Sequence, residues 1–137
     1  MLKNALNFIQ DTVNEARGSA IDNFKNKRSF VKRLEESNRI MSKYPDRIPI
    51  IVCRANTCKD IPDIDRHKYL VPRDLSIGQF MHVIRQRIKL QPHISIYLMI
   101  NDFTMPATSQ LLGVIYNEYS DDDGFMYITY TGESTFG

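Results

Sequence analysis

Residues 48–54 read IPIIVCR, and residues 125–130 read FMYITY. Both stretches are rich in β-branched and aromatic residues, which predicts two strands. Between them we expect a short strand at 68–71, a helix at 77–88, a buried strand at 95–101 and a short helix opened by Ser109. Residues 55–67, which contain Pro62, are expected to form a loop.

Three helical segments are expected before residue 48. An apolar stripe with helical spacing covers residues 2–16, and a short second turn follows through Ile21 and Phe24. A third helix, over about 29–43, is expected to begin at Ser29 and to end at residues 44–45, where proline follows tyrosine. Its buried side should carry Phe30, Leu34 and Met41.

The resulting order is a set of helices followed by β-β-α-β-α-β. This order predicts an α+β fold, a ubiquitin-like β-grasp with additional N-terminal helices. The first and last strands, which are the most hydrophobic, should lie at the centre of the sheet. Ser76 and Gln79 form a capping-box pattern at the start of the helix at 77–88.

The composition is that of one ordinary globular domain, with 137 residues, 42% of them hydrophobic and 25% charged. Two cysteines are too few for a disulfide framework, which favours an intracellular protein with reduced thiols. The sequence contains no apolar run near the ~20 residues of a membrane span and no signal-peptide pattern.

The charges are divided unevenly along the chain. All 18 Lys and Arg residues lie in residues 1–90, whereas residues 91–137 carry 6 acidic residues and neither Lys nor Arg. This division favours an acidic partner or an anionic surface for the first part of the chain. A solvated basic face is the alternative.

We expect no metal site, no cofactor and no catalytic machinery. Cys53, Cys58 and His67 lack a fourth ligand at suitable spacing, so we interpret Cys53 as a packed thiol and Cys58 as an exposed one. The acids at 121–123 are contiguous and no glutamate closes a calcium loop, so they are interpreted as a turn before the last strand. The sequence also contains no phosphate-binding loop and no nucleophile motif, which argues against an enzyme.

Two features indicate a binding or conjugation function instead. Residues 131–137 are expected to form a polar, mobile tail that ends in Gly137, whose carboxylate could pass through a narrow channel and be activated for transfer to an amine. Residues 68–71, followed by Pro72, have the pattern of an edge strand that can accept a peptide strand. A protected edge with charges that deter aggregation is an equal alternative.

The sequence closely resembles the autophagy-related protein 8 family, the group of GABARAP and microtubule-associated protein light chain 3. The resemblance lies in YPDRIP at 44–49, KYLVP at 68–72, IGQF at 77–80 and IRQRI at 84–88. The end of the chain also fits, with YITY at 127–130 and ESTFG at 133–137. The resemblance covers residues 29–137, and the ordered run of motifs makes it specific.

The resemblance implies a ubiquitin-like autophagy modifier that is conjugated through Gly137 to phosphatidylethanolamine on autophagosomal membranes. It would dock short aromatic-x-x-aliphatic motifs of cargo receptors. Its other partners would be activating and conjugating enzymes and a processing cysteine protease, with no nucleic acid. The protein would be cytoplasmic until lipid conjugation places it on the autophagosome membrane. The alternatives are a modifier joined to a protein lysine and a non-conjugated module that binds microtubules.

The resemblance also implies three groups of site residues. The pocket for the aromatic residue would be lined by Glu36, Ile40, Pro49, Ile51, Lys68, Leu70 and Phe125. The pocket for the aliphatic residue would comprise Tyr69, Val71, Pro72, Leu75, Phe80, Val83 and Ile84, with Arg87 at its border. Arg47, Arg66 and Lys68 would meet acidic residues beside the motif.

We expect residues 1–28 to be a helical extension and residues 29–137 to be the ubiquitin-like domain. The stripe in the extension could fold back on the domain, lie on a membrane surface or contact tubulin. Gly124 stands where the family often has a bulky residue, which bears on the shape of the aromatic pocket. Family precursors carry residues after the glycine, so Gly137 is either the native end or the product of proteolysis.

Overall fold

The computed structural model describes residues 20–132, so the expected helix over residues 2–16 and the tail residue Gly137 lie outside the described residues. The elements are α2 (Ala20–Lys25), α3 (Phe30–Lys43), β1 (Arg47–Arg54), β2 (Lys68–Pro72), α4 (Ile77–Arg87), β3 (Ile96–Ile100), α5 (Leu112–Tyr119) and β4 (Met126–Gly132). The expected element order and the α+β class are confirmed. Within residues 20–132, no helix has the length and hydropathy needed to cross a bilayer.

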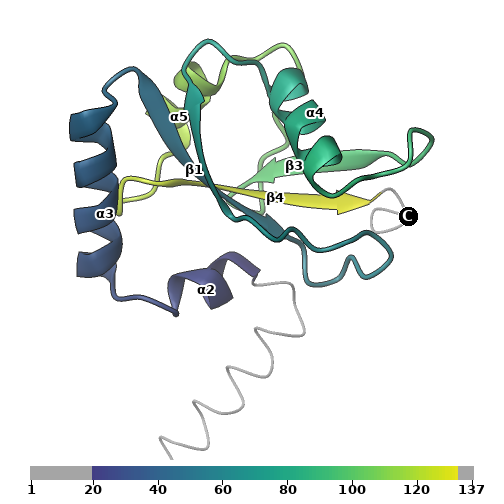
Figure 1. The fold of residues 1–137 in the computed structure, drawn as a ribbon, viewed down its shortest axis with the longest axis horizontal. Helices are drawn as coiled ribbons and strands as arrows, with labels where there is room; N and C mark the ends of the chain where they lie inside the picture. The colour runs from purple at the N-terminus through teal and green to yellow at the C-terminus, as the bar shows by residue number, and fades with distance from the viewer. Residues whose placement is uncertain (1–19, 133–137) are drawn as a thin grey trace, which may run out of the picture.

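The four strands form one sheet in the order β2-β1-β4-β3. β1 runs parallel to β4, and the outer strands pair antiparallel with their neighbours. The two most hydrophobic strands are therefore central, as expected. Helices α2 and α3 lie on one side of this sheet, and α4 and α5 lie on the other (Figure 1). Because both faces are covered, β1 and β4 are buried along almost their whole length.

Two apolar clusters hold the layers together. The larger one lies between the sheet and helices α4 and α5, and it includes Phe80, Ile84 and Tyr130. The smaller one joins α2 to the other face through Ile21, and it includes Ile51, Cys53, Phe125 and Tyr127. This second cluster forms the apolar part of the site described below.

Helix α3 begins and ends as expected, but it buries a different face. The Ser29 side chain accepts a hydrogen bond from the Lys32 amide and caps the helix. Phe30 is 44% exposed, which contradicts its expected burial, and Leu34 and Met41 are half-buried. The buried positions are Glu36 and Ser37, and both have polar partners: Glu36 pairs with Lys68, and the Ser37 hydroxyl donates to the Asp123 carbonyl.

Helix α4 carries the expected capping box between Ser76 and Gln79. Helix α5, in contrast, does not begin at Ser109; its N-cap is Leu111, which makes no side-chain capping bond. The preceding residues form a turn in which the Gln110 side chain accepts from the Ala107 amide. This turn replaces the first helical turn that Ser109 was expected to open.

The last strand extends further than expected. Thr131 and Gly132 belong to β4 and are buried, so the prediction of a mobile tail from residue 131 was wrong for these two residues. The Gly132 amide donates to the sulfur of Cys58 at 3.2 Å, and Cys58 is fully buried. The prediction that Cys58 is exposed was therefore wrong, since the loop after β1 folds over the end of β4. Burial also raises the pKa of the Cys53 thiol to about 12.

Candidate functional site: an aromatic cavity beside an edge strand

Strand β2 lies at the edge of the sheet, and among the described strands it pairs with β1 alone. Two exposed arginine side chains donate to its backbone. Arg66 donates to the carbonyl oxygen of Lys68 at 3.3 Å, and Arg47 donates to that of Leu70 at 3.4 Å. Both distances are long for a hydrogen bond to a carbonyl. The open side of β2 therefore presents acceptors that a peptide strand could take over from these side chains.

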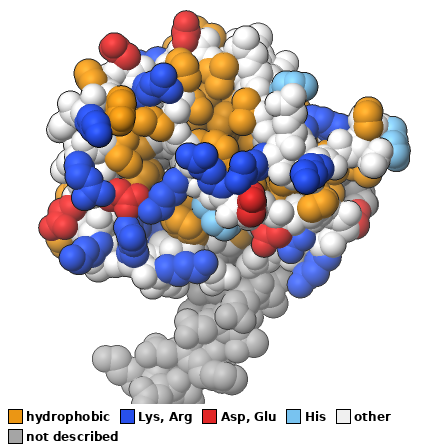
Figure 2. Space-filling view, viewed as in Figure 1, with side chains coloured by type: hydrophobic (Ala, Val, Ile, Leu, Met, Phe, Trp, Pro, Cys, Tyr) orange, Lys and Arg blue, Asp and Glu red, His pale blue; other side chains and the backbone are white. Residues whose placement is uncertain are grey.

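A cavity of about 220 Å³ lies beside this strand. Its wall combines apolar side chains from α2, β1 and the start of β4 with charged side chains from the connection between α2 and α3, from α3 and from β2. It is lined by Phe24, Lys27, Arg28, Arg33, Glu36, Ile51, Lys68, Phe125 and Tyr127. A band of Lys and Arg side chains crosses this face of the molecule, with hydrophobic side chains gathered beside it (Figure 2).

The floor of the cavity is apolar and fixed in place. Ile51, Phe125 and Tyr127 are at most 3% exposed, and the rings of Phe125 and Tyr127 lie 6.5 Å apart. Phe24 of α2 forms another side, and its own ring packs on His67 at 5.4 Å. Such a wall suits a flat apolar side chain, because most of the surface of that side chain would be buried against the protein once it is inside the cavity.

The rim carries a carboxylate held by two cations. Glu36 is 8% exposed, and it pairs with Lys68 at 2.6 Å and with Arg28. Lys68 and Arg28 are about half exposed, with side-chain exposures of 46% and 56%. Since two cations face one carboxylate, the rim keeps a positive excess that favours acidic groups beside an incoming apolar residue.

The structure brings together part of the expected aromatic pocket. Glu36, Ile51, Lys68 and Phe125 line the cavity. The other three expected residues lie around it without lining it. Ile40 packs against the smaller cluster, and Pro49 lies opposite Leu70 in the β1–β2 register.

Five lining residues were missed by the sequence analysis: Phe24, Lys27, Arg28, Arg33 and Tyr127. The helical segment that contains Phe24 was predicted, but the sequence did not indicate that the Phe24 side chain lines the cavity. The contact of α2 with β4 joins segments about a hundred residues apart, and no local pattern reports such a contact.

The residues of the expected aliphatic pocket fall into two groups. Phe80 and Ile84 are fully buried in the larger core, so they can contribute only a floor, and Val71 is also buried. Tyr69 and Leu75 are partly buried, whereas Pro72 and Val83 are exposed. The Tyr69 ring meets Phe80 edge-on at 5.7 Å. Arg87 makes a two-fold hydrogen bond to Asp65 at 2.8 and 3.0 Å.

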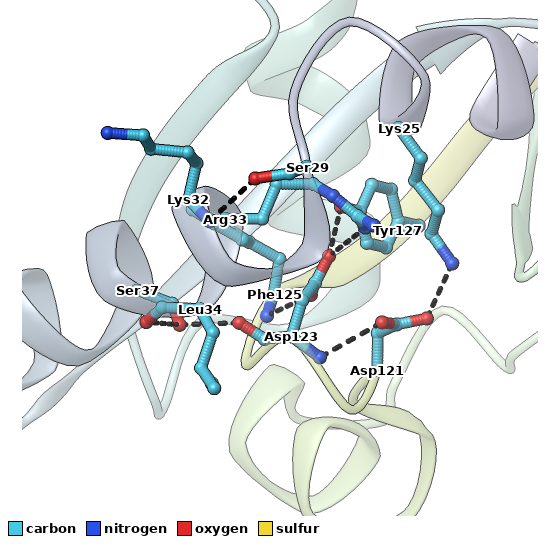
Figure 3. A network of polar contacts seen from close by, with 10 residues as sticks. All are labelled: Lys25, Ser29, Lys32, Arg33, Leu34, Ser37, Asp121, Asp123, Phe125 and Tyr127. Carbon is cyan, nitrogen blue, oxygen red and sulfur yellow. Dashed lines mark hydrogen bonds and ion pairs between the residues drawn. The ribbon is translucent and has the colours of Figure 1, made fainter.

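A buried polar network fixes α3 against the start of β4 (Figure 3). The Asp123 carboxylate has no exposed surface and accepts from Arg33 at 2.7 Å, from the Tyr127 hydroxyl at 2.6 Å and from the Phe125 amide at 2.9 Å. The Ser37 hydroxyl donates to the Asp123 carbonyl at 2.5 Å. Burial, followed by the bond to Asp123, raises the pKa of Tyr127, so its hydroxyl remains a donor. The network positions two residues of the cavity floor.

Gly124 has a backbone conformation that an L side chain adopts only with strain, with φ at +88°. A Cβ at this position would lie 2.3 Å from the Ser37 hydroxyl oxygen. The bulky residue that the family often has here would therefore collide with α3 in this backbone conformation.

We expect Gly124→Ala to lower the free energy of unfolding by about 2–3 kcal/mol, from the left-handed backbone and the displaced Ser37 together. Gly78→Ala is the control, because its Cβ would meet no atom closer than 3.3 Å. Urea denaturation of both variants measures the effect. Equal stability of the two variants would contradict the close approach of Gly124 to α3.

Within residues 20–132, no group of three or more His, Cys, Asp and Glu side chains is arranged to hold a metal ion. Cys53 and Cys58 are both buried free thiols. His67 packs on Phe24, with its Nδ1 atom 2.8 Å from the Val52 carbonyl oxygen. The chemistry that this arrangement supports is recognition of a peptide, through backbone pairing and an apolar cavity.

Comparisons with known proteins agree with this fold. The model of the family "Autophagy protein Atg8 ubiquitin like" matches residues 32–137. The chain is 54% identical over 114 residues to Autophagy-related protein 8 of Mycosarcoma maydis, covering 83% of this chain and 95% of that protein. It is 51% identical over 118 residues to Autophagy-related protein 8d of Arabidopsis thaliana, covering 86% and 97%. The crystal structure of Trypanosoma brucei ATG8 superposes with a TM-score of 0.76 at 38% identity, covering 83% of this chain and 97% of that one.

Proposed function

This chain belongs to the Atg8 family of ubiquitin-like autophagy proteins, and from that premise we propose two linked activities. The first is docking of short aromatic-x-x-aliphatic peptides of cargo receptors at β2. The second is conjugation through Gly137 to phosphatidylethanolamine. Conjugation would move the protein from the cytoplasm to the autophagosome membrane, with activating and conjugating enzymes and a cysteine protease as partners. In this proposal the chain is the modifier on which those enzymes act, and not itself an enzyme.

The single observation that carries the docking proposal is the aromatic cavity beside the edge strand. A peptide strand added to β2 would pair with the backbone of Lys68 and Leu70, whose carbonyls now receive long bonds from Arg66 and Arg47. Backbone pairing is largely indifferent to side chains, so specificity must come from the pockets on either side. The aromatic residue would enter the cavity, and the aliphatic residue would rest on Tyr69 above Phe80.

The charges around β2 also favour docking of a peptide there. When the peptide pairs with β2, Arg66 and Arg47 would release the carbonyl oxygens of Lys68 and Leu70 and could then pair with acidic residues of the peptide. Lys68 and Arg28 already surround Glu36 at the rim, so an acidic flank would compete for cations that are about half exposed. We therefore assign Arg47, Arg66 and Lys68 an electrostatic role in addition to the apolar anchors.

We expect Tyr69→Ala and Leu70→Ala each to weaken the binding of a Trp-x-x-Leu peptide roughly 30-fold. Each substitution removes contacts of one anchor side chain of the peptide, and the loss of one anchor typically costs ~2 kcal/mol or more of binding free energy. Arg47→Glu and Lys68→Glu should weaken peptides with acidic flanks most, and this loss should shrink as salt screens the charges. Calorimetric titration measures both effects.

Val114→Ala serves as the control, since Val114 is 59% exposed on α5 and belongs to neither expected pocket. Circular dichroism checks that each variant is folded. If the folded Tyr69 and Leu70 variants bind as tightly as the parent protein, the docking site is not at β2.

The other candidate functions give different results. Conjugation to a protein lysine gives an adduct whose mass differs from that of a lipid adduct. For a microtubule-binding module, removal of the C-terminal tail should leave cosedimentation with microtubules intact, whereas removal of residues 1–28 should abolish it.

A further inference from the structure

Strand geometry decides which side chains a docked peptide meets on each face of the sheet. We count the aromatic residue of the peptide as position i, so that the aliphatic residue is i+3. In a strand these two positions point to opposite faces, whereas i+1 and i+3 share one face. The aromatic cavity lies on the face covered by α2 and α3, and Tyr69 packs against Phe80 of α4 on the other face. The residue at i+1 would therefore point toward the α4 face, on which Tyr69 lies.

An ion pair between Asp65 and Arg87 borders this second face. Arg87, the last residue of α4, donates through Nε and one terminal nitrogen to the two carboxylate oxygens of Asp65, at 2.8 and 3.0 Å. Its side chain is 44% exposed and that of Asp65 is 72% exposed, so a docked peptide can reach both. The bond to Arg87 lowers the pKa of Asp65, which keeps the carboxylate ionised. The pair is therefore neutral as a whole.

Tyr69 lies close enough to this pair to feel both of its charges, and it adds no charge of its own. Burial raises the pKa of Tyr69, and the charges of Arg87, Arg66 and Asp65 act on its hydroxyl as well. The hydroxyl therefore stays protonated and neutral. The Arg66 guanidinium lies 5.9 Å from the centre of the Tyr69 ring. The charged groups beside Tyr69 are thus two arginines and one carboxylate, and that carboxylate is bonded to Arg87.

The two faces of the docking site differ in the cations that they offer to a peptide. At the rim of the cavity, Lys68 and Arg28 share the single carboxylate of Glu36, which leaves a positive excess. On the α4 face, Arg87 has a carboxylate of its own and binds both of its oxygens. A peptide carboxylate that approaches Arg87 would therefore also approach Asp65, whose repulsion offsets the attraction.

We propose that Asp65 is a specificity-determining residue of the docking site, because by holding Arg87 it removes the attraction that this arginine would exert on an acidic residue at position i+1. The inference rests on the proposed docking function and adds to it a residue outside the expected pockets. Peptides would be selected for acidic residues beside the cavity but not for an acidic residue at i+1. Arg66 is present with or without Asp65, so the charge of Asp65 is what separates the two cases.

The size of the effect follows from the exposure of the pair. Exposed ion pairs contribute little individually, so removing Asp65 should change the affinity for a peptide with an acidic residue at i+1 by about three- to five-fold. Salt screens charges at this exposure, so the change should shrink as the ionic strength rises. The two anchor side chains of the peptide would still supply most of the affinity.

Calorimetric titration of the full chain with three Trp-x-x-Leu peptides, which carry Glu, Gln or Lys at i+1, tests the proposal. The parent protein should bind the Glu and Gln peptides within about two-fold of each other. Asp65→Asn should favour the Glu peptide over the Gln peptide by about three- to five-fold more than the parent does. Arg87→Gln leaves Asp65 unpaired, so it should shift the preference toward the Lys peptide. The double variant should return close to the preference of the parent, because the two charges act as a pair.

Glu118→Gln is the matched control, since it removes the same charge from an exposed position on α5 and should leave the peptide preference of the parent unchanged. If Asp65→Asn alters the affinities for the Glu and Gln peptides equally, or no more than Glu118→Gln does, the role of Asp65 is overturned while the docking function stands. If the parent protein binds none of the three peptides, the docking function itself is overturned.

Discussion

Replacing Asp123 by alanine is expected to lower the free energy of unfolding by about 3–5 kcal/mol, the usual cost of removing one partner of a buried ion pair. The carboxylate is fully buried, and its partner Arg33 has only 14% of its side chain exposed. The substitution would leave a guanidinium in an apolar environment, with Nε already lacking a hydrogen-bond partner. The Tyr127 hydroxyl and the Phe125 amide would lose their acceptor as well.

Asp122→Ala is the matched control, since it removes the neighbouring carboxylate from an exposed position. We expect it to change the stability by about 0.5 kcal/mol or less. Asp123→Asn keeps the shape and one acceptor oxygen, so its stability should lie between the two. Urea denaturation gives all three values. Equal stability of the two alanine variants would show that the network does not hold α3 to β4.

Replacing Gly137 is expected to abolish transfer to the aminophospholipid. In the proposed reaction, the C-terminal carboxylate is activated as an adenylate, passes to an enzyme thiol as a thioester and is then attacked by the lipid amine. A residue without a Cβ can thread a narrow channel and expose its carbonyl to attack, which alanine would hinder. Gly132, the last described residue, is the end of β4, and Gly137 follows it by five residues in the sequence.

The assay combines the protein with the cognate activating and conjugating enzymes, ATP and phosphatidylethanolamine liposomes, and compares Gly137→Ala with Ser134→Ala. The serine variant changes the same tail without altering the reacting residue, so it should still form the adduct. Mass spectrometry identifies the acceptor as a lipid or a protein lysine. An undiminished lipid adduct on Gly137→Ala would contradict conjugation through this residue.

The local elements were predictable because local patterns determine them. The two central strands follow from runs of β-branched and aromatic residues, and the capping box at Ser76 marks the start of α4. The motifs at 44–49 and 68–72 carry the family resemblance, and the edge position of β2 agrees with its proline and short length. Four of the seven expected aromatic-pocket residues line the cavity.

The failures concern contacts between distant segments. The stripe of α3 predicted burial of Phe30, yet the helix buries Glu36 because Lys68 and Arg28 compensate its charge. Cys58 is buried because its loop folds back over Gly132, 74 residues later. Apolar periodicity reports the local face of a helix or strand, and it carries no information about a distant ion-pair partner.

Titration of the isotope-labelled protein with a Trp-x-x-Leu peptide, followed by amide chemical shifts, tests the docking site most directly. If the peptide adds a strand to β2, the largest shifts will fall on Lys68–Pro72 and on the residues around Ile51 and Phe125 that form the cavity floor. The Trp side chain should also shift the amides of α2 near Phe24, which lines the same cavity. Shifts confined to β3, at the opposite edge of the sheet, with β2 unchanged, would contradict this account.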